Sequence, residues 1–197
     1  AFASSFMVQP DLFLRVRPGK KAIVQDKLDE SGIHYNTLDD ACIALPNSTK
    51  VESLLEINKE VVIQDRSSQK TGSFIKPAID MLQNHHAAPA VWDCCAASGG
   101  KAIMAFDLIK NIDLTVSDIR PSIIDNLRTR FSEAGISGYK SFVADIGGKS
   151  EIPRPGKYDL IIADVPCTGS RTWARTPEQL YFFKEEKIDQ YRNLQKN

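Results

Sequence analysis

The chain has 197 residues, of which 42% are hydrophobic and 25% are charged, and its 25 basic and 25 acidic side chains leave no formal net charge. This composition is globular and excludes a disordered, collagen-like or coiled-coil protein, and the length suffices for one ordinary domain with a small additional unit. A neutral chain is not expected to hold nucleic acid by its overall charge, which leaves local basic patches as the alternative.

Segments that would target the chain to a membrane are not expected. No apolar run reaches the roughly 18–20 residues that a membrane-spanning helix needs, so we predict no membrane association. The start, AFASSFMVQP, lacks the charged and apolar regions of a signal peptide and begins without Met, which indicates a processed or missing start. The four cysteines form no CxxC pair, which favours a reducing cytoplasm.

Residues 1–72 are predicted to form a small α+β domain. Alternating residues at Leu12–Val16 indicate a strand that ends at Pro18 and Gly19, and the apolar spacing of Lys20–Gly32 indicates a helix. The further expected elements are a strand at Cys42–Leu45, a helical segment at Ser53–Leu55 and a strand at Glu60–Ile63.

Residues 73–197 have a different pattern of predicted elements. A helix is predicted from Phe74 to His85, provided that Pro77 lies in its first turn. Alternation of strands and helices is typical of an α/β fold with a parallel, doubly wound sheet, and the apolar run Leu160–Ala163 is typical of a strand covered on both faces. The alternating elements are expected at Ala90–Cys95, Lys101–Lys110, Asp113–Asp118, Pro121–Ala134, Ser141–Asp145 and Tyr158–Asp164.

The most informative segment is the loop from Asp93 to Lys101, DCCAASGGK, where the first strand of this sheet meets its helix. Its small residues allow a ligand to approach the backbone closely, and the following helix offers free N–H groups. The spacing is neither GxGxxG nor GxxxxGK(S/T), so neither a dinucleotide nor a triphosphate is expected. A turn built only for close packing is the alternative.

Acidic residues end three consecutive predicted strands. Asp118, Asp145 and Asp164 end the second, third and fourth strands, and ligands in parallel sheets bind beyond these carboxyl ends. In nucleoside-binding sheets the acid after the second strand accepts hydrogen bonds from ribose hydroxyls. A single such acid is usually the N-cap of the next helix, but three of them beside a Gly-Gly turn predict one shared crevice.

Two segments after the fourth strand are candidates for contact with a substrate. Cys167 follows Pro166 near the predicted crevice, with a small buried apolar side chain as the alternative. Trp173 lies between Arg171 and Arg175, a combination that can stack on a base and attract phosphate, with a buried aromatic wall as the alternative. No metal site is expected, since no third ligand is spaced for the pair His85 and His86.

Taken together, three motifs resemble those of the Sun/RsmB-type RNA cytosine-5 methyltransferase family. The family's D-x-C-A-A-P-G-G-K motif is matched from Asp93 to Lys101, with Ser98 in place of Pro. Its D-x-P-C-(S/T)-G motif is matched from Asp164 to Gly169, and its Q-D-x-(A/S)-S-Q motif from Gln64 to Gln69. The resemblance implies a Rossmann-like class I methyltransferase sheet, with strands 1–4 in this chain, preceded by a small RNA-recognition-like domain.

The same resemblance implies S-adenosylmethionine as cofactor and ribosomal or transfer RNA as substrate. Separately, we expect a monomer, and the cysteine usage favours the cytoplasm. Asp118 would hold the ribose hydroxyls, Asp145 would lie near the adenine, and Asp164 would lie between the cofactor and the target cytosine. The residues around Trp173 would contact RNA. The loop would wrap the methionine end of the cofactor through Cys95, Ala96, Ala97, Ser98, Gly99, Gly100 and Lys101.

The chemistry of this family depends on cysteine. Cytosine C5 is a poor nucleophile, and a thiolate that adds to C6 enables C5 to attack the methyl group. The target base must leave its stack, which is easiest in single-stranded or looped RNA. In the family the attacking cysteine belongs to a later Thr-Cys motif, whereas the Pro-Cys thiol, here Cys167, assists release of the product and Asp164 steadies the base.

The sequence contains no Thr-Cys dipeptide, and strands five to seven of the family's sheet have no counterpart before Asn197. We therefore expect that the chain is a fragment of an enzyme, or that further residues follow it. Without them the apolar fourth strand would form an open edge of the sheet. Two alternatives stay open. One is a catalytically incomplete relative or fragment that binds RNA and cofactor, and the other is a DNA-type cytosine methylase with Cys167 as nucleophile.

Overall fold

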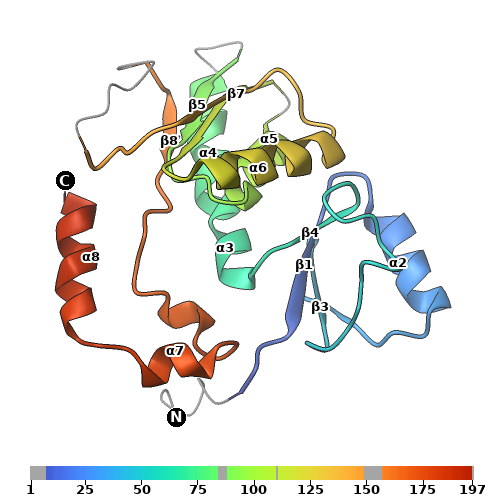
Figure 1. The fold of residues 1–197 in the computed structure, drawn as a ribbon. Coiled ribbons are helices and arrows are strands. Elements are labelled where there is room, and N and C mark those ends of the chain that lie inside the picture. The colour runs from blue at the N-terminus through green and yellow to red at the C-terminus, as the bar shows by residue number, and fades with distance from the viewer. Residues whose placement is uncertain (1–7, 84–87, 110, 149–156, 197) are drawn as a thin grey trace.

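The computed structural model describes residues 8–83, 88–109, 111–148 and 157–196. These residues form two four-stranded sheets that follow one another along the chain (Figure 1). The first sheet is antiparallel and the second is parallel.

The antiparallel sheet has the strand order β2-β3-β1-β4. The helix α2 (Lys21–Glu30) packs its buried residues Val24 and Leu28 into a core with Leu14, Ile43 and Val61 of this sheet. The strands are β1 (Leu12–Val16), β2 (Asn36–Thr37), β3 (Cys42–Leu45) and β4 (Val61–Ile63).

The expected helical segment at Ser53–Leu55 is wrong. The chain forms turns there, in which the N–H groups of Leu54 and Leu55 both donate to the carbonyl of Val51, at 3.0 and 2.8 Å. The segment is too short to offset the cost of nucleating a helix, and burial of Val51 and Leu55 fixes the turns instead. The short strand β2 and the helix α3 (Arg66–Lys70) lay outside the prediction.

The parallel sheet confirms the predicted Rossmann-like α/β class. Its strand order is β7-β6-β5-β8, so the first strand of the unit, β5, lies between the second and the fourth. Such a reversal of strand order opens a crevice at the carboxyl ends of the strands. The strands are β5 (Ala90–Asp93), β6 (Asp113–Asp118), β7 (Lys140–Val143) and β8 (Leu160–Ile162), and the helices between them are α5 (Gly100–Leu108) and α6 (Pro121–Glu133).

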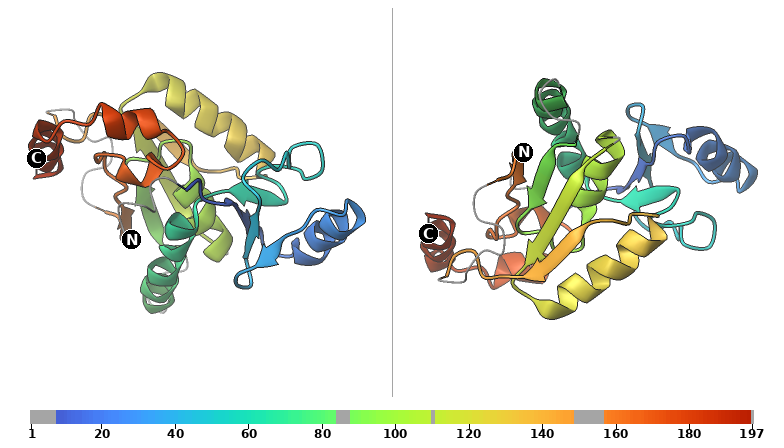
Figure 2. Two further views of the ribbon diagram at one scale, coloured as in Figure 1. Left: turned by 90° about the horizontal axis from the view of Figure 1, so that it is seen from below. Right: turned by 90° about the horizontal axis from the view of Figure 1, so that it is seen from above.

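Helices α5 and α6 share one face of the parallel sheet (Figure 2). A single core cluster joins Ile103 of α5 and Phe131 of α6 with Val91 of β5. Because side chains alternate along a strand, Trp92 points to the opposite face. There its ring stacks on Tyr158, with ring centroids 5.1 Å apart.

The fourth strand, β8, differs from the prediction in its burial. Ile161 is 53% exposed, so the expectation of a strand covered on both faces is wrong for the described residues. The physical reason is the strand's position, since β8 lies at one end of the described sheet and pairs there with β5.

The helix α4 (Gly72–Gln83) begins earlier than predicted, which places Pro77 inside the helix and not in its first turn. A proline in this position removes the N–H that would bond to the carbonyl of Ser73. Both Ser73 and Pro77 are exposed, so water can satisfy this carbonyl.

The chain continues after β8 with the 3-10 helix η1 (Ser170–Thr172) and the helices α7 (Pro177–Tyr181) and α8 (Glu186–Lys196). Figure 1 shows α7 and α8 on the side of the molecule away from α2. Of the helices in the described ranges, none has the length and apolar character needed to cross a bilayer.

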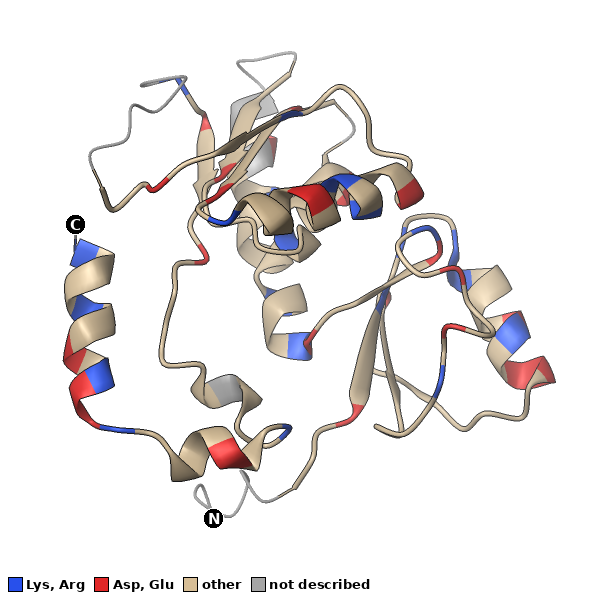
Figure 3. Ribbon diagram, viewed as in Figure 1, with Lys and Arg blue, Asp and Glu red and all other residues tan. Residues whose placement is uncertain are grey.

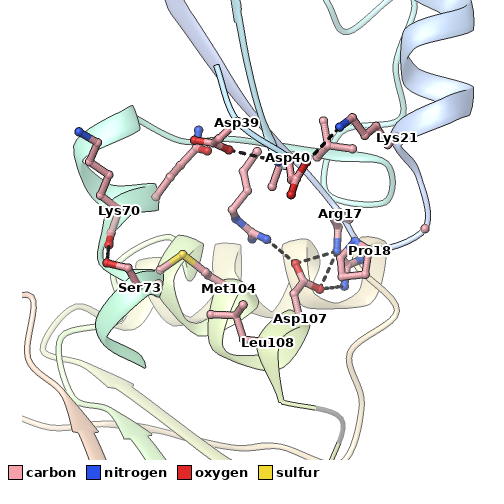
Figure 4. Close-up of a pocket in the computed structure, with 16 residues that line it drawn as sticks. Arg17, Pro18, Lys21, Asp39, Asp40, Lys70, Ser73, Met104, Asp107 and Leu108 are labelled. Carbon is pink, nitrogen blue, oxygen red and sulfur yellow. Dashed lines mark hydrogen bonds and ion pairs between the residues drawn. The ribbon is translucent and has the colours of Figure 1, made fainter. Parts of the chain in front are cut away.

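The two sheets meet in a junction that contains both apolar and charged contacts. Val62 of β4 belongs to the core cluster of the parallel sheet. Arg15 and Arg17 of the antiparallel sheet and its turn bind the carboxylate of Asp107 on α5, at 2.5 and 2.7 Å (Figure 4). A cavity of about 440 Å³ borders these contacts and includes Lys21, Asp39 and Met104 among its lining residues.

Candidate functional site

The loop between β5 and α5 is tied by its backbone to both neighbouring strands. The N–H of Cys94 donates to the carbonyl of Ile162 on β8 at 3.0 Å, and the N–H of Ala96 donates to Ser117 on β6 at 2.9 Å. The N–H of Ala97 donates to the Asp118 carboxylate at 3.0 Å. These bonds hold the loop at the carboxyl ends of β5, β6 and β8.

Two residues of this loop have left-handed backbone conformations. Ala97 has φ +45°, and a residue with a Cβ is strained there. Gly99 has φ +82°, and a Cβ at this position would lie 2.8 Å from the ring of Phe131. Close packing on α6 therefore explains Gly99, whereas a Cβ on Gly100 would come no closer than 3.8 Å to Gln64.

A cavity of about 540 Å³ lies at this edge of the sheet, within the usual range for a small-molecule site. It brings together five residues that the sequence predicted for one crevice, namely Cys95, Ala97, Asp118, Asp145 and Asp164. Its apolar wall includes Ile119, Ala144, Ile146, Val165 and Leu194, the last of which belongs to α8.

Asp118 is buried and fully engaged at the end of β6. Its carboxylate accepts from the Ala97 N–H and from the backbone and guanidinium of Arg120, at distances of 2.9 to 3.1 Å. Burial alone would raise the pKa of Asp118, but the hydrogen bonds from Arg120 and Ala97 outweigh it and lower this pKa below the ordinary value. Asp118 is therefore a charged acceptor at the centre of the cavity.

The other two acids, Asp145 and Asp164, line the same cavity. Asp145 accepts from the N–H of Gly147 at 3.1 Å, which fixes the turn after β7. Asp164 is half exposed and forms an ion pair with Lys101, whose side chain is largely buried. This ion pair links the loop after β5 to the segment after β8.

A buried carboxylic acid, Asp93, lies directly behind this ion pair. Its side-chain oxygens have no well-aligned hydrogen-bond partner among the described residues, although the backbone N–H groups of Cys95 and Ala102 face them. The residue is 1% exposed. Burial raises the pKa of Asp93 to about 7, although Lys101 opposes this effect. Close to neutral pH, Asp93 therefore exchanges a proton beside Lys101 and Asp164.

A second, smaller cavity of about 260 Å³ adjoins the first. Its lining combines Gln64 and Ser68, which lie between the two sheets, with Lys101 and Arg130 of the parallel unit. The predicted loop residues Ala96, Ser98 and Gly100 also line it. The two cavities share Cys95, Ala97 and Asp164.

The residues predicted to contact RNA have intramolecular contacts in the structure. The ring of Trp173 packs on Phe183, with centroids 4.9 Å apart. Arg175 donates to Asp65 at 2.5 Å and to the carbonyl of Asp11 at 3.3 Å. The side chain of Arg171 lies outside the described residues, so the proposed RNA contacts stay predictions.

Cys167 is exposed and lies beside Pro166, which lines the larger cavity, although Cys167 itself does not line it. All four cysteines are described and none forms a disulfide. Burial raises the pKa of Cys94 to about 12 and also raises the pKa of Cys95, so the two thiols of the loop resist ionisation.

Metal binding has no candidate site in the part of the chain that the structure describes, where no group of three or more His, Cys, Asp or Glu side chains could hold an ion. The pair His85 and His86 lies outside these residues.

The prediction from sequence missed several residues of the site, among them Ile119, Arg120, Asp93 and Arg130. Ile119 and Arg120 follow the acid of β6 directly, and this position beside a strand-end acid could have indicated them. Asp93 was included in the loop motif without a role, and its burial has no signal in the sequence. Arg130 lies 32 residues from its partner Ser98, so spacing along the chain could not connect them.

The fold and the site together define a class of protein. A parallel sheet with this strand order, a small-residue loop after its first strand and an acid at the end of the second are the features of Rossmann-like nucleoside-binding proteins. Residues 78–197 match the model of the family described as 16S rRNA methyltransferase RsmB/F, and the chain belongs to this family.

Curated relatives carry names of the same kind. The chain is 26% identical over 185 residues to the probable ribosomal RNA small subunit methyltransferase B of Bacillus subtilis (strain 168), covering 91% of this chain and 40% of the relative. It is 25% identical over 140 residues to the ribosomal RNA small subunit methyltransferase B of Proteus mirabilis (strain HI4320), covering 69% of this chain and 30% of the relative. The chain thus spans less than half the length of these relatives.

Two solved structures share the fold. The protein PH0851 matches with a TM-score of 0.81 and 22% identity, over 99% of this chain and 44% of that one. NSun6 from Pyrococcus horikoshii, determined with SFG, matches with a TM-score of 0.76 and 12% identity, over 98% of this chain and 72% of that one. At these identities the likeness concerns the fold.

Proposed function

We propose that the protein transfers a methyl group from S-adenosylmethionine to carbon 5 of a cytosine in ribosomal or transfer RNA. The observation that carries this proposal is the pair of adjoining cavities that share Cys95, Ala97 and Asp164. One cavity has the charged acceptor of a nucleoside site, and the other opens beside it between the two sheets. Membership of the RsmB/F family and the fold of NSun6, solved with the S-adenosylmethionine analogue SFG, support the same assignment.

The residues of the larger cavity fit the cofactor. The four hydrogen bonds to Asp118 occupy its roughly four lone-pair sites, so the ribose hydroxyls replace the two bonds from the exposed side chain of Arg120. Ile119 and Ile146 provide apolar contact for the adenine beside Asp145. The methionine end lies against Cys95 and Ala97, which both cavities share, and points toward Gly100 at the start of α5 in the smaller cavity.

When bound, S-adenosylmethionine supplies an electrophilic methyl group, and the residues of this chain orient the base that receives it. Asp164 accepts a hydrogen bond from the amino group of the cytosine, and Lys101 holds Asp164 in place. Burial raises the pKa of Cys94 and of Cys95, which disfavours both thiols as the nucleophile that adds to C6. Cys167, which is exposed after Pro166, assists release of the methylated base.

The remaining assignments follow from this activity. We assign residues 1–72 to a domain that contacts RNA and residues 73–197 to the first part of the methyltransferase domain. Trp173 and the arginines beside it, Arg171 and Arg175, contact the RNA. The protein acts as a monomer in the cytoplasm.

A transfer assay tests the proposal. Full-length protein is incubated with S-adenosylmethionine labelled in its methyl group and small-subunit ribosomal RNA or transfer RNA, and the RNA is digested to nucleosides. We expect the label in 5-methylcytidine, and replacement of Asp118 by Ala lowers kcat/KM at least about tenfold. The matched control, Asp125→Ala, removes an exposed acid of α6 and keeps the wild-type rate. Label in another nucleoside, or no transfer to either RNA, contradicts the proposal.

A trapping experiment assigns the role of Cys167. RNA that carries 5-fluorocytosine stays attached to the attacking cysteine, because the fluorine at C5 cannot leave as a proton does. If Cys167 serves in release, the Cys167→Ser variant still forms the covalent adduct. Loss of the adduct in this variant makes Cys167 the nucleophile, as in DNA-type cytosine methylases.

A further inference from the structure

One side chain of α6 bonds to the loop between β5 and α5, called here the cofactor loop. The carbonyl of Ser98 lies between Ala97 and Gly99, the two residues with positive φ. It accepts a hydrogen bond of 2.7 Å from Nη1 of Arg130. A charged donor on this carbonyl stabilises a turn whose backbone is strained at Ala97.

The same arginine also bonds to the antiparallel sheet and its turns, called here the N-terminal unit. Its Nε and Nη2 donate to the side-chain carbonyl of Asn58 at 3.0 and 2.8 Å. Asn58 is 4% exposed, has φ +67° and donates through Nδ2 to Glu133 of α6 at 2.7 Å. The planar guanidinium thus bonds to the cofactor loop and to the turn before β4 at the same time.

Arg130 is half-buried between these partners. Burial lowers the pKa of Arg130, against the opposing charge of Glu133, although an arginine remains charged at neutral pH. Arg17 joins the units away from the loop, since it donates to Ala134 at the end of α6 and to Asp107 on α5. Gln64, in contrast, borders the loop beside Gly100. Arg130 is hydrogen-bonded both to Asn58 of the N-terminal unit and to Ser98 of the loop.

We propose that Arg130 is a positioning residue that couples the docking of the N-terminal unit, through Asn58, to the shape of the cofactor loop at Ser98. The inference rests on the proposed function, because it takes the larger cavity to be the cofactor site. If cofactor binding orders the loop, it also strengthens the Arg130 contacts, and the coupling is reciprocal. RNA that moves the N-terminal unit then changes the affinity for the cofactor by the same route.

Isothermal titration of the full-length protein with S-adenosylhomocysteine measures this coupling. We expect Arg130→Gln to bind roughly 5- to 30-fold more weakly than the wild type, since the variant loses the charged bond to Ser98. Asn58→Gly removes the acceptor but tolerates the positive φ, and we expect it to weaken binding in the same direction. Arg128→Gln is the matched control, because Arg128 lies on the same helix and bonds to Asp125 and Ser141, and it keeps the wild-type affinity.

Thermal unfolding of each variant establishes that it is folded at the temperature of the titration. In the double variant, the two losses of affinity are expected to be less than additive, because both substitutions break one connection. Wild-type affinity in folded Arg130→Gln overturns the inference, and additive losses overturn the link through Asn58. A wild-type protein that does not bind S-adenosylhomocysteine refutes the proposed function itself, so the two failures are distinguishable.

Discussion

At the scale of single residues, the site depends on side chains whose environment sets their charge. Asp118 is kept charged by Arg120 and the loop, whereas Asp93 is buried without a well-aligned hydrogen-bond partner among the described residues. The two acids end neighbouring strands, yet the pKa of one is lowered and that of the other is raised to about 7. Opposite shifts in adjacent acids are typical of functional sites.

The raised pKa of Asp93 predicts a pH-dependent stability. The folded protein retains this proton up to about pH 7, whereas the unfolded chain releases it near 3.8, so stability falls as the pH rises between these values. Replacing Asp93 by Asn removes this contribution, which is on the order of 1 kcal/mol per pH unit. In urea unfolding from pH 4 to 8, the stability of the variant relative to the wild type should increase up to about pH 7 and then stay constant. A difference that is independent of pH, as expected for the exposed control Asp125→Asn, would refute the burial argument.

Gly99 predicts a different kind of defect, in which sterics and backbone strain add. Gly99→Ala places a Cβ 2.8 Å from Phe131 at φ +82°, and we expect it to cost about 2–4 kcal/mol. Gly135→Ala is the control, because Gly135 has φ +69° with no atom within 4 Å of the added Cβ, and it should cost only about 1 kcal/mol. Equal losses in the free energy of unfolding would show that Phe131 does not restrict the loop.

At the scale of elements, α4 shows where the sequence pattern misleads. The proline rule predicted that the helix would begin close to Pro77. The helix begins at Gly72 instead, because the exposed carbonyl of Ser73 can bond to water in place of the missing N–H. Turns at Val51–Leu55 replace a predicted helix for the opposite reason, because buried side chains and not propensity decide them. Helix boundaries here depend on exposure, which a local pattern does not contain.

The interior proline predicts that α4 can be stabilised. Pro77→Ala restores one helical hydrogen bond and should raise the free energy of unfolding by about 1–3 kcal/mol, reduced by the greater freedom of the unfolded chain. Pro121→Ala, at the first turn of α6, should give no gain, because a proline is well suited to that position. Chemical denaturation of both variants measures the difference, and equal effects would contradict this account of α4.

At the scale of the whole molecule, acidic and basic residues are interspersed along α2, α6 and α8 (Figure 3). Arg15 in β1 and Arg17 directly after this strand do not form a free basic patch. They are buried against Asp107 and join the two sheets. The zero net charge of the chain thus includes charges that serve its internal junction.

This junction predicts a large effect from one substitution. Asp107→Asn leaves two buried arginines without their acid and should cost about 3–5 kcal/mol in the free energy of unfolding. Lys140→Gln breaks an exposed pair with Asp113 and should cost less than about 1 kcal/mol. If the two losses measured by urea denaturation are equal, the junction does not hold the sheets together.

The sequence alone predicted the parallel sheet and the five residues that meet in the larger cavity. This was possible because strand ends of a parallel sheet converge, so Asp118, Asp145 and Asp164 needed no tertiary information. The bridge from Arg130 to Asn58 spans 72 residues and could not be predicted, because nothing local identifies its partners. The contribution of Leu194 to the cavity wall depends likewise on how α8 folds back.

A crystal structure of the full-length protein with S-adenosylhomocysteine is the most direct test of the cofactor site. The account predicts electron density for the ligand in the larger cavity, with both ribose hydroxyls within hydrogen-bond distance of Asp118. The amino-acid end should lie against the loop from Cys95 to Lys101. A ligand bound at another place, or one that makes no contact with Asp118, would contradict the account.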